Sequence, residues 1–173
     1  EAAGFGGPIW PVHPTRRQIA GRAAVRSVAE LPEPPDAAFV AVNATATVEI
    51  VRELAELGAG GAICYAAGFA ETGAAGAELQ ARLDALVATA DTRLLGPNTN
   101  LNAFELFDDL PGPALALVTQ SGHQGRPIFQ AQAIGVAVSH WAPTGNEIDL
   151  EAADFVGWFA TRPEVGGVAA YIE

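Results

Sequence analysis

Two short stretches decide the fold that this sequence predicts: AAGFAETG at residues 66–73 and LLGPN at residues 94–98. Each one closes a short apolar run, and each places a glycine where the backbone can turn. In open α/β sheets, such turns at the carboxyl ends of strands expose backbone N–H groups and form nucleotide sites. The two stretches therefore predict a parallel sheet with a nucleotide-type site at one edge.

Strand-like and helix-like segments alternate around these stretches. Apolar runs predict buried strands at residues 37–42, 61–67 and 93–96. Between them, apolar residues at helical spacing predict helices at residues 45–57 and 74–90, the first of which ends before Gly58. Alternating strands and helices indicate a parallel sheet with right-handed crossovers.

Residues 105–113, ELFDDLPGP, interrupt this alternation with acidic residues, prolines and a glycine, which predicts a boundary between two units. After the boundary, strands are expected at residues 114–119, 135–141 and 166–172. A helix is expected at residues 124–134, with Pro127 in its first turn, where a missing N–H is tolerated. Another helix is expected to follow a cap at Asp149.

The chain accordingly divides into one α/β unit at residues 1–104, a linker at residues 105–113 and a second α/β unit at residues 114–173. No strand pattern precedes the opening residues of the first unit, and the second unit stops after its third strand. We therefore expect each unit to be part of a larger domain, the first without its initial strand and helix.

The composition argues against several classes of protein. A net charge of −11 disfavours nucleic acid and anionic membranes as partners, and no apolar run is long enough to span a bilayer. No secretory signal pattern follows residue 1, and the single cysteine, Cys64, fits a buried thiol in a reducing, cytoplasmic setting. Neither His13 nor His140 has metal-ligand spacing with another histidine, so no metal site is expected.

All nine basic residues are arginines, and four of them lie within the first 26 residues. A local positive zone of this kind on an acidic protein could hold a polyanion, because the field depends on the local arrangement of charges. The alternative is an ordinary solvated face. Both interpretations remain open for Arg22 and Arg26.

Four segments fit strand ends at such a site: PVHPTRR (residues 11–17), VNAT (residues 42–45), and the two stretches that end in ETG and GPN. In this order and spacing they resemble the CoA-binding domain of the acyl-CoA synthetases that form ADP or GDP, the family of the succinyl-CoA synthetase α subunit. That domain usually reads YPVNPK, VPA, SAGF-E-G and LLGPN. Thr15 stands where the family usually has Lys, Asn43 replaces a Pro, and the family's glycine-rich loop is not in this sequence.

The resemblance implies an α/β fold, with a Rossmann-like CoA-binding domain followed by a partial flavodoxin-like domain. It implies that coenzyme A meets Pro14, Thr15, Arg16, Arg17, Val42, Asn43, Ala44, Ala67, Gly68, Phe69, Pro97 and Asn98. The guanidinium group of Arg16 or Arg17 could bind the 3′-phosphate of coenzyme A through two hydrogen bonds.

In the second unit, a predicted strand ends at Gln120, Ser121 and Gly122, where a following helix would point free N–H groups at one spot. In the family this turn, usually SQSG or SRSG, faces a phosphohistidine, so the resemblance assigns these residues to phosphate stabilisation, with His123 beside them. It also implies that Glu173 hydrogen-bonds the phosphorylated histidine. The alternatives are an ordinary turn with Ser121 as helix cap, a surface histidine and a solvated acid.

The family's phosphorylated histidine lies in a Gly- and Ser-rich motif further along than residue 173, so His123 is not expected to be that residue. Because parallel strands end at the same sheet edge, Ser121 and Glu173 should lie on one side, within about 10–15 Å.

The resemblance implies an acid–thiol ligase that converts acid, CoA and ATP into acyl-CoA, ADP and phosphate through an acyl phosphate and a phosphohistidine. The ATP/ADP site would lie on an ATP-grasp domain or β-type subunit outside this chain, which is expected to be inactive alone and to act in an oligomer. A non-catalytic CoA- or acyl-CoA-binding regulatory module is the alternative, favoured by Thr15, Asn43 and His123. A dinucleotide-binding oxidoreductase is disfavoured because no G-x-G-x-x-G with a following acidic residue occurs.

Overall fold

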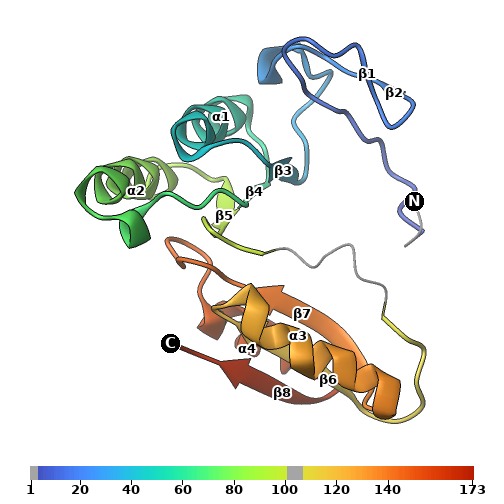
Figure 1. Ribbon diagram of the computed structural model, residues 1–173. Coiled ribbons are helices and arrows are strands. Elements are labelled where there is room, and N and C mark those ends of the chain that lie inside the picture. The colour runs from blue at the N-terminus through green and yellow to red at the C-terminus, as the bar shows by residue number, and fades with distance from the viewer. Residues whose placement is uncertain (1–3, 101–106) are drawn as a thin grey trace.

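The computed structural model describes residues 4–100 and 107–173. A parallel sheet with the strand order β3-β4-β5 forms the centre of the first unit (Figure 1). Its strands are Ala38–Val40, Gly61–Cys64 and Arg93–Leu95. The connecting helices are α1, Ala44–Leu57, and α2, Ala74–Val87. Each strand and helix falls within or one residue from its expected range.

The sequence around α1 supplies both of its ends. The side chain of Asn43 accepts a hydrogen bond from the N–H of Ala46 at 2.9 Å and so caps the amino end. Gly58 terminates the helix in the left-handed region, with φ of 87°, where glycine has no Cβ to clash. The helical spacing of Val48, Val51 and Leu54 then places these three side chains in the core.

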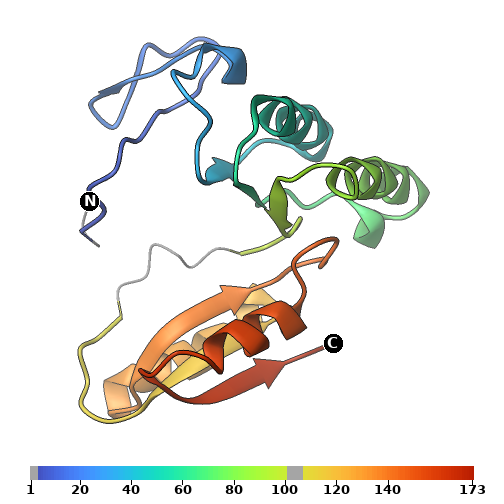
Figure 2. The same cartoon turned by 180° about the vertical axis from the view of Figure 1, so that it is seen from behind.

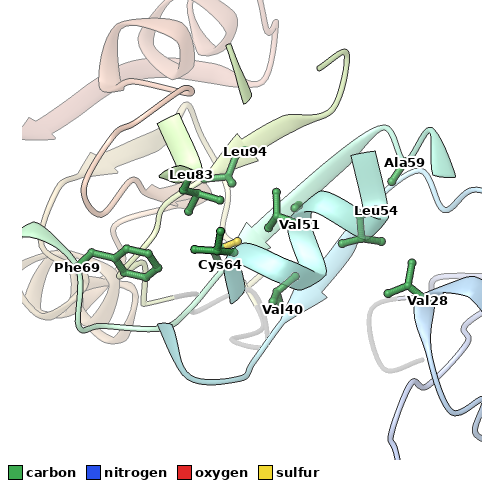
Figure 3. Packing of buried hydrophobic residues seen from close by; sticks show 11 residues of the cluster. Val28, Val40, Val51, Leu54, Ala59, Cys64, Phe69, Leu83 and Leu94 are labelled. Atoms are coloured by element: carbon green, nitrogen blue, oxygen red, sulfur yellow. The ribbon is translucent and has the colours of Figure 1, made fainter. Parts of the chain in front are cut away.

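Figure 3 shows how one apolar cluster joins both helices to the same face of this sheet. Val51 and Leu54 come from α1, Leu83 comes from α2, and Leu94 comes from β5. Cys64 is fully buried among them, and burial raises the pKa of its thiol to about 12. The expectation of a buried structural thiol is confirmed.

The N-terminal segment contains an antiparallel hairpin that the sequence analysis did not predict. Its strands are β1, Gln18–Ile19, and β2, Arg22–Ala23, and both turn residues, Ala20 and Gly21, have positive φ. Strands of two residues give no detectable alternation, which explains the omission. Val28, in the short 3-10 helix Val28–Glu30, is 3% exposed and attaches this segment to the core beside α1.

The second unit is a parallel sheet with the order β7-β6-β8 and helices on both faces. Its strands are β6, Ala114–Thr119; β7, Val138–Pro143; and β8, Val165–Tyr171. Its helices are α3, Gly122–Gln130, and α4, Ala152–Phe159. Alternate residues of β6 serve opposite faces: Val118 packs with Phe159 of α4, and Leu117 packs with Phe129 of α3.

Three local expectations in the second unit are wrong. The helix expected from residue 124 begins at Gly122, so Pro127 is its sixth residue and lies beyond the first turn. The strand expected at residues 135–141 is β7, which lies further along the chain because the left-handed Gly135 first ends the preceding 3-10 turn. Glu151, in a capping box with Asp154, caps α4 instead of Asp149.

The expected linker at residues 105–113 falls partly outside the described residues, and the part from residue 107 to residue 113 contains no helix or strand. None of the helices in the described part of the chain has the length and apolarity that crossing a bilayer requires.

Candidate functional site

The segments that follow β3, β4 and β5 converge at one edge of the first sheet. Gly68, with φ of 107°, lies so close to Ala44 that an added Cβ would be 3.4 Å from the Ala44 Cβ. The N–H of Asn98 donates to the carbonyl of Ala66 at 2.9 Å. The structure therefore brings the VNAT, AAGFAETG and GPN segments together, as their positions after parallel strands predict.

A carboxylate already occupies the backbone donors of the AAGFAETG turn. The Glu71 Oε1 atom accepts hydrogen bonds from the N–H of Gly68 at 2.6 Å and of Phe69 at 3.1 Å. Burial raises the pKa of Glu71, but hydrogen bonds from Asn146, Gly68 and Phe69 outweigh burial and hold this pKa below its usual value. Sequence reasoning did not single out Glu71, although its place three residues after a turning glycine was visible.

Three residues expected to contact coenzyme A have structural roles: two of their side chains are buried, and the third, which is exposed, caps a helix. The Phe69 side chain is fully buried in the core, and the Pro97 side chain is also fully buried. Asn43 caps α1, which gives the replacement of the family's usual proline a local reason. Val42, Ala67 and Asn98 remain exposed at this edge.

The positive segment forms a turn of its own. The Nδ1 atom of His13 accepts hydrogen bonds from the N–H of Thr15 at 3.2 Å and of Arg16 at 3.1 Å. Pro14, Thr15, Arg16 and Arg17 are all exposed. Within residues 4–100 and 107–173, no hydrogen bond or ion pair joins them to the three strand-end segments, so their assignment to coenzyme A stays a prediction.

In the second unit, Gln120 joins the ends of two neighbouring parallel strands. Its N–H donates to the carbonyl of Tyr171 at 3.0 Å, and its Oε1 atom accepts from the N–H of Glu173 at 2.5 Å. Its Nε2 atom donates to the Glu147 carboxylate at 3.0 Å. Gln120 and Glu173 thus leave the same sheet edge side by side, and both ends of the Gln120 amide are engaged by the protein.

The amino end of α3 begins directly at this junction. Ser121 occupies the N-cap position, but its side chain makes no capping hydrogen bond, so it does not act as an ordinary side-chain cap. Gly122 is buried, and His123 is exposed in the first turn. An α-helix begins with N–H groups that lack intrahelical partners and carries partial positive charge, which suits a phosphate group.

Two strand-end clusters have now been described, the segments after β3, β4 and β5 in the first unit and the residues after β6 and β8 in the second, and they contact each other. A Cβ on Gly122 would lie 2.3 Å from the Cβ of Asn100, so the start of α3 packs directly against the chain just after the GPN turn. Residues 144–150, which we call the docking loop, extend from β7 to β5 (Figures 1 and 2). The N–H groups of Asn146, Ile148 and Leu150 donate to the carbonyls of Pro97, Gly96 and Leu94.

The docking loop also uses side chains. Asp149 accepts hydrogen bonds from the N–H of Leu94 at 2.6 Å and from the Arg93 Nε atom at 3.0 Å. Glu147 accepts from Gln120 and from the hydroxyl of Thr144. No group of His, Cys, Asp and Glu large enough to hold a metal ion occurs in the described residues. The site is therefore a pair of strand edges, one from each unit, joined by a loop that the sequence analysis did not identify.

Comparison with known proteins accounts for this pairing. A family model described as a CoA binding domain matches residues 2–104. The chain belongs to this family. A second model, described as a succinyl-CoA ligase like flavodoxin domain, matches residues 111–173. The expected order of a Rossmann-like CoA-binding domain and a flavodoxin-like domain is confirmed.

Relatives of the chain include a trans-feruloyl-CoA synthase from an unknown prokaryotic organism, 33% identical over 98% of the chain and 26% of the relative. The alpha subunit of the ADP-forming acetate–CoA ligase II of Pyrococcus furiosus is 30% identical over 97% of the chain and 38% of the relative. A dinucleotide forming acetyl-coenzyme A synthetase 1 of Ca. Korarchaeum cryptofilum, solved with phosphate and ADP, superposes with a TM-score of 0.86. It is 26% identical, over 99% of the chain and 39% of that protein.

The chain spans about a quarter to two fifths of the length of these proteins. The expected relationship to NDP-forming acyl-CoA synthetases is confirmed for the two domains that the chain contains.

Proposed function

We propose that this chain is the CoA-binding part of an NDP-forming acyl-CoA synthetase, which converts a carboxylic acid, CoA and ATP into acyl-CoA, ADP and phosphate. The observation that carries the proposal is the contact between the two strand-end clusters, where Gly122 packs against Asn100. A thiol bound along the first edge would there meet an acyl phosphate held at the second. This juxtaposition supports thioester synthesis more strongly than CoA storage or sensing.

The proposed reaction has three transfers. A histidine outside this chain attacks the terminal phosphorus of ATP and releases ADP. The substrate carboxylate then takes the phosphoryl group from the histidine and becomes an acyl phosphate. Finally the CoA thiolate attacks the acyl carbon, the thioester forms and inorganic phosphate leaves.

In this scheme the second unit handles the phosphoryl group. The N–H groups at the start of α3, around Ser121, Gly122 and His123, hold the phosphoryl oxygens without having to reorganise. Glu173 accepts a hydrogen bond from the imidazole and fixes its tautomer. Gln120, with both ends of its amide engaged, positions Glu173 relative to the turn.

The first unit binds coenzyme A in the proposal. Arg16 or Arg17 is assigned to its 3′-phosphate, and the exposed Val42, Ala67 and Asn98 to its arm. The backbone that surrounds coenzyme A in the proposal is formed by Pro14, Thr15, Ala44 and Gly68. Asn43, Phe69 and Pro97 contribute through the conformation of their segments, because their side chains are committed to the fold.

The proposal assigns the ATP/ADP site to an ATP-grasp domain or a β-type subunit. It also includes an oligomeric assembly and a cytoplasmic location. The relatives named for acetate and for feruloyl-CoA act on acids of very different size. The proposal therefore assigns a carboxylic acid as substrate and leaves its size open.

Calorimetry tests the CoA assignment directly. The complete protein should bind CoA more tightly than dephospho-CoA, because one charge-assisted contact is worth about 1.5–3 kcal/mol. Replacing both Arg16 and Arg17 by Gln should remove this difference. Equal affinity for the two ligands in the unmodified protein would overturn the assignment of the arginines.

The catalytic part needs the nucleotide-binding partner. With it, continued ADP release beyond one equivalent per enzyme should depend on both acid and CoA, and without it no release should occur. CoA binding without acid-dependent ADP release in the assembled protein would instead support a regulatory module.

A further inference from the structure

Asn146 makes four hydrogen bonds to the first unit, although it belongs to the second. Its N–H donates to the carbonyl of Pro97 at 2.9 Å. Its Nδ2 atom donates to the Glu71 Oε2 atom at 2.9 Å and to the Gln80 Oε1 atom at 3.0 Å. Its Oδ1 atom accepts from the Asn98 side chain at 3.3 Å. One half-buried side chain thus links the turns after β4 and β5 to α2.

Glu71 divides its carboxylate between the two units. One oxygen, Oε1, is used by the backbone N–H groups of Gly68 and Phe69, and the other, Oε2, is used by Asn146. The Asn146 amide therefore holds the Glu71 carboxylate in place, and this carboxylate holds the backbone of the residue 68–73 turn. Removing that donor would free one oxygen of Glu71 and allow the whole turn to move.

We propose that Asn146 is a positioning residue for coenzyme A, which fixes the residue 68–73 turn and Asn98 in their binding arrangement from across the unit boundary. The inference rests on the proposed function and deepens it, because it makes the CoA site a product of both units. The docking loop also contacts the turn at residues 120–122, to which the proposed function assigns the phosphoryl group. There the N–H of Gly145 donates to the Gln120 carbonyl at 3.2 Å. A single segment therefore sets the relative position of the thiol and the acyl phosphate.

A donor–acceptor exchange tests this inference. Asn146→Asp removes the donor and places a second carboxylate against Glu71, so the affinity for CoA should fall about tenfold or more. Glu71→Gln should also weaken binding, because its amide N–H₂ would then face that of Asn146. In the double variant, the new amide at position 71 can donate to the new carboxylate at position 146, while its oxygen still accepts from Gly68 and Phe69. The Gln80 Oε1 atom also accepts from the N–H of Ala70 at 3.3 Å, so turning the Gln80 amide to donate to position 146 gives up that hydrogen bond. The affinity should therefore return in part, to a value clearly above that of either single variant.

A matched control separates positioning from simple docking of the loop. Asp149→Ala removes hydrogen bonds between the same loop and β5, but it does not touch the residue 68–73 turn or Asn98. This variant should melt at a lower temperature and bind CoA within about twofold of the unmodified protein, below its melting range. Loss of CoA affinity in Asp149→Ala as large as in Asn146→Asp would assign the effect to docking and overturn the inference.

The remaining outcomes are also decisive. Unchanged CoA affinity in Asn146→Asp, or no recovery in a folded double variant, contradicts the role of Asn146. Absence of CoA binding to the unmodified protein contradicts the proposed function itself, and the two failures are thereby distinguished.

Discussion

A polar residue at a strand end can serve a ligand or the fold, and three residues of this chain show how the two are separated. Asn43 satisfies an N–H of α1, and Glu71 satisfies two N–H groups of its own turn. Gln120 is engaged at its amide and at its backbone N–H. Each lies in or next to a segment that the motifs identify, but its hydrogen-bond partners decide what it can offer to a ligand.

Cys64 provides a prediction at this scale. Its side chain has no exposed surface, and burial raises the pKa of its thiol to about 12, so thiolate is scarce at pH 8. We expect iodoacetamide to label the native protein very slowly and the protein in guanidinium chloride rapidly, as mass spectrometry would measure. Rapid stoichiometric labelling of the native protein would show that the core around β4 opens.

At the scale of elements, the docking loop depends on one close approach. Gly145 has φ of 70°, and a Cβ there would lie 2.3 Å from the carbonyl oxygen of Pro97. The backbone of the loop can therefore reach β5 only because this residue has no side chain.

Gly145→Ala should lower the free energy of unfolding by about 1–3 kcal/mol, since it combines backbone strain with a steric clash. Gly135→Ala is the matched control, because Gly135 also has positive φ, 91°, but has open space around its would-be Cβ. Urea titrations should give the larger loss for Gly145→Ala. Equal losses would mean that the close approach to Pro97 adds nothing to the strain.

The same elements show which parts of the structure sequence patterns can predict. The strands and helices of both sheets follow local apolar spacing, so their ranges were predictable within a few residues. Asp149 has the residue type and position of a helix cap, but it instead binds Leu94, 55 residues away in the sequence. Asn146 binds Glu71 across 75 residues, and no local pattern encodes such a contact. The strand-end segments were predictable, whereas the loop that joins them was not.

At the scale of the whole molecule, the two units differ in which faces of their sheets the helices cover. The helices of the first sheet share one face, whereas α3 and α4 cover opposite faces of the second. The carboxyl edges of the sheets are held against each other by the docking loop and by the packing of Asn100 on Gly122 (Figure 2). Under the proposed function, this arrangement separates CoA recognition from phosphoryl handling while keeping them adjacent.

Glu173 tests that separation. Its backbone N–H is held by Gln120 at the carboxyl edge of the second sheet, so Glu173→Gln changes a side chain without removing this contact. In the assembled enzyme the substitution should lower phosphoenzyme formation by about tenfold or more, on the order of one charge-assisted hydrogen bond. CoA affinity should stay within about twofold, because the Glu173 hydrogen bond seen in the described residues goes to Gln120 and not to the residue 68–73 turn or Asn98. Acid-labile labelling from γ-labelled ATP and calorimetry measure the two effects. An unchanged labelling rate would leave Glu173 a solvated acid.

The strand order of the second sheet has a consequence for the chain as it leaves the ribosome. β6, at the centre, is made first, but its partners β7 and β8 follow, and Val165 emerges 46 residues after Thr119. At typical translation speeds of about 5–20 residues per second, β6, with the sequence ALALVT, lacks its β8 partner for some seconds, and one of its edges stays unpaired. Such a strand, free of charge and proline, is a site for aggregation, and nascent-chain chaperones have their greatest value during that interval.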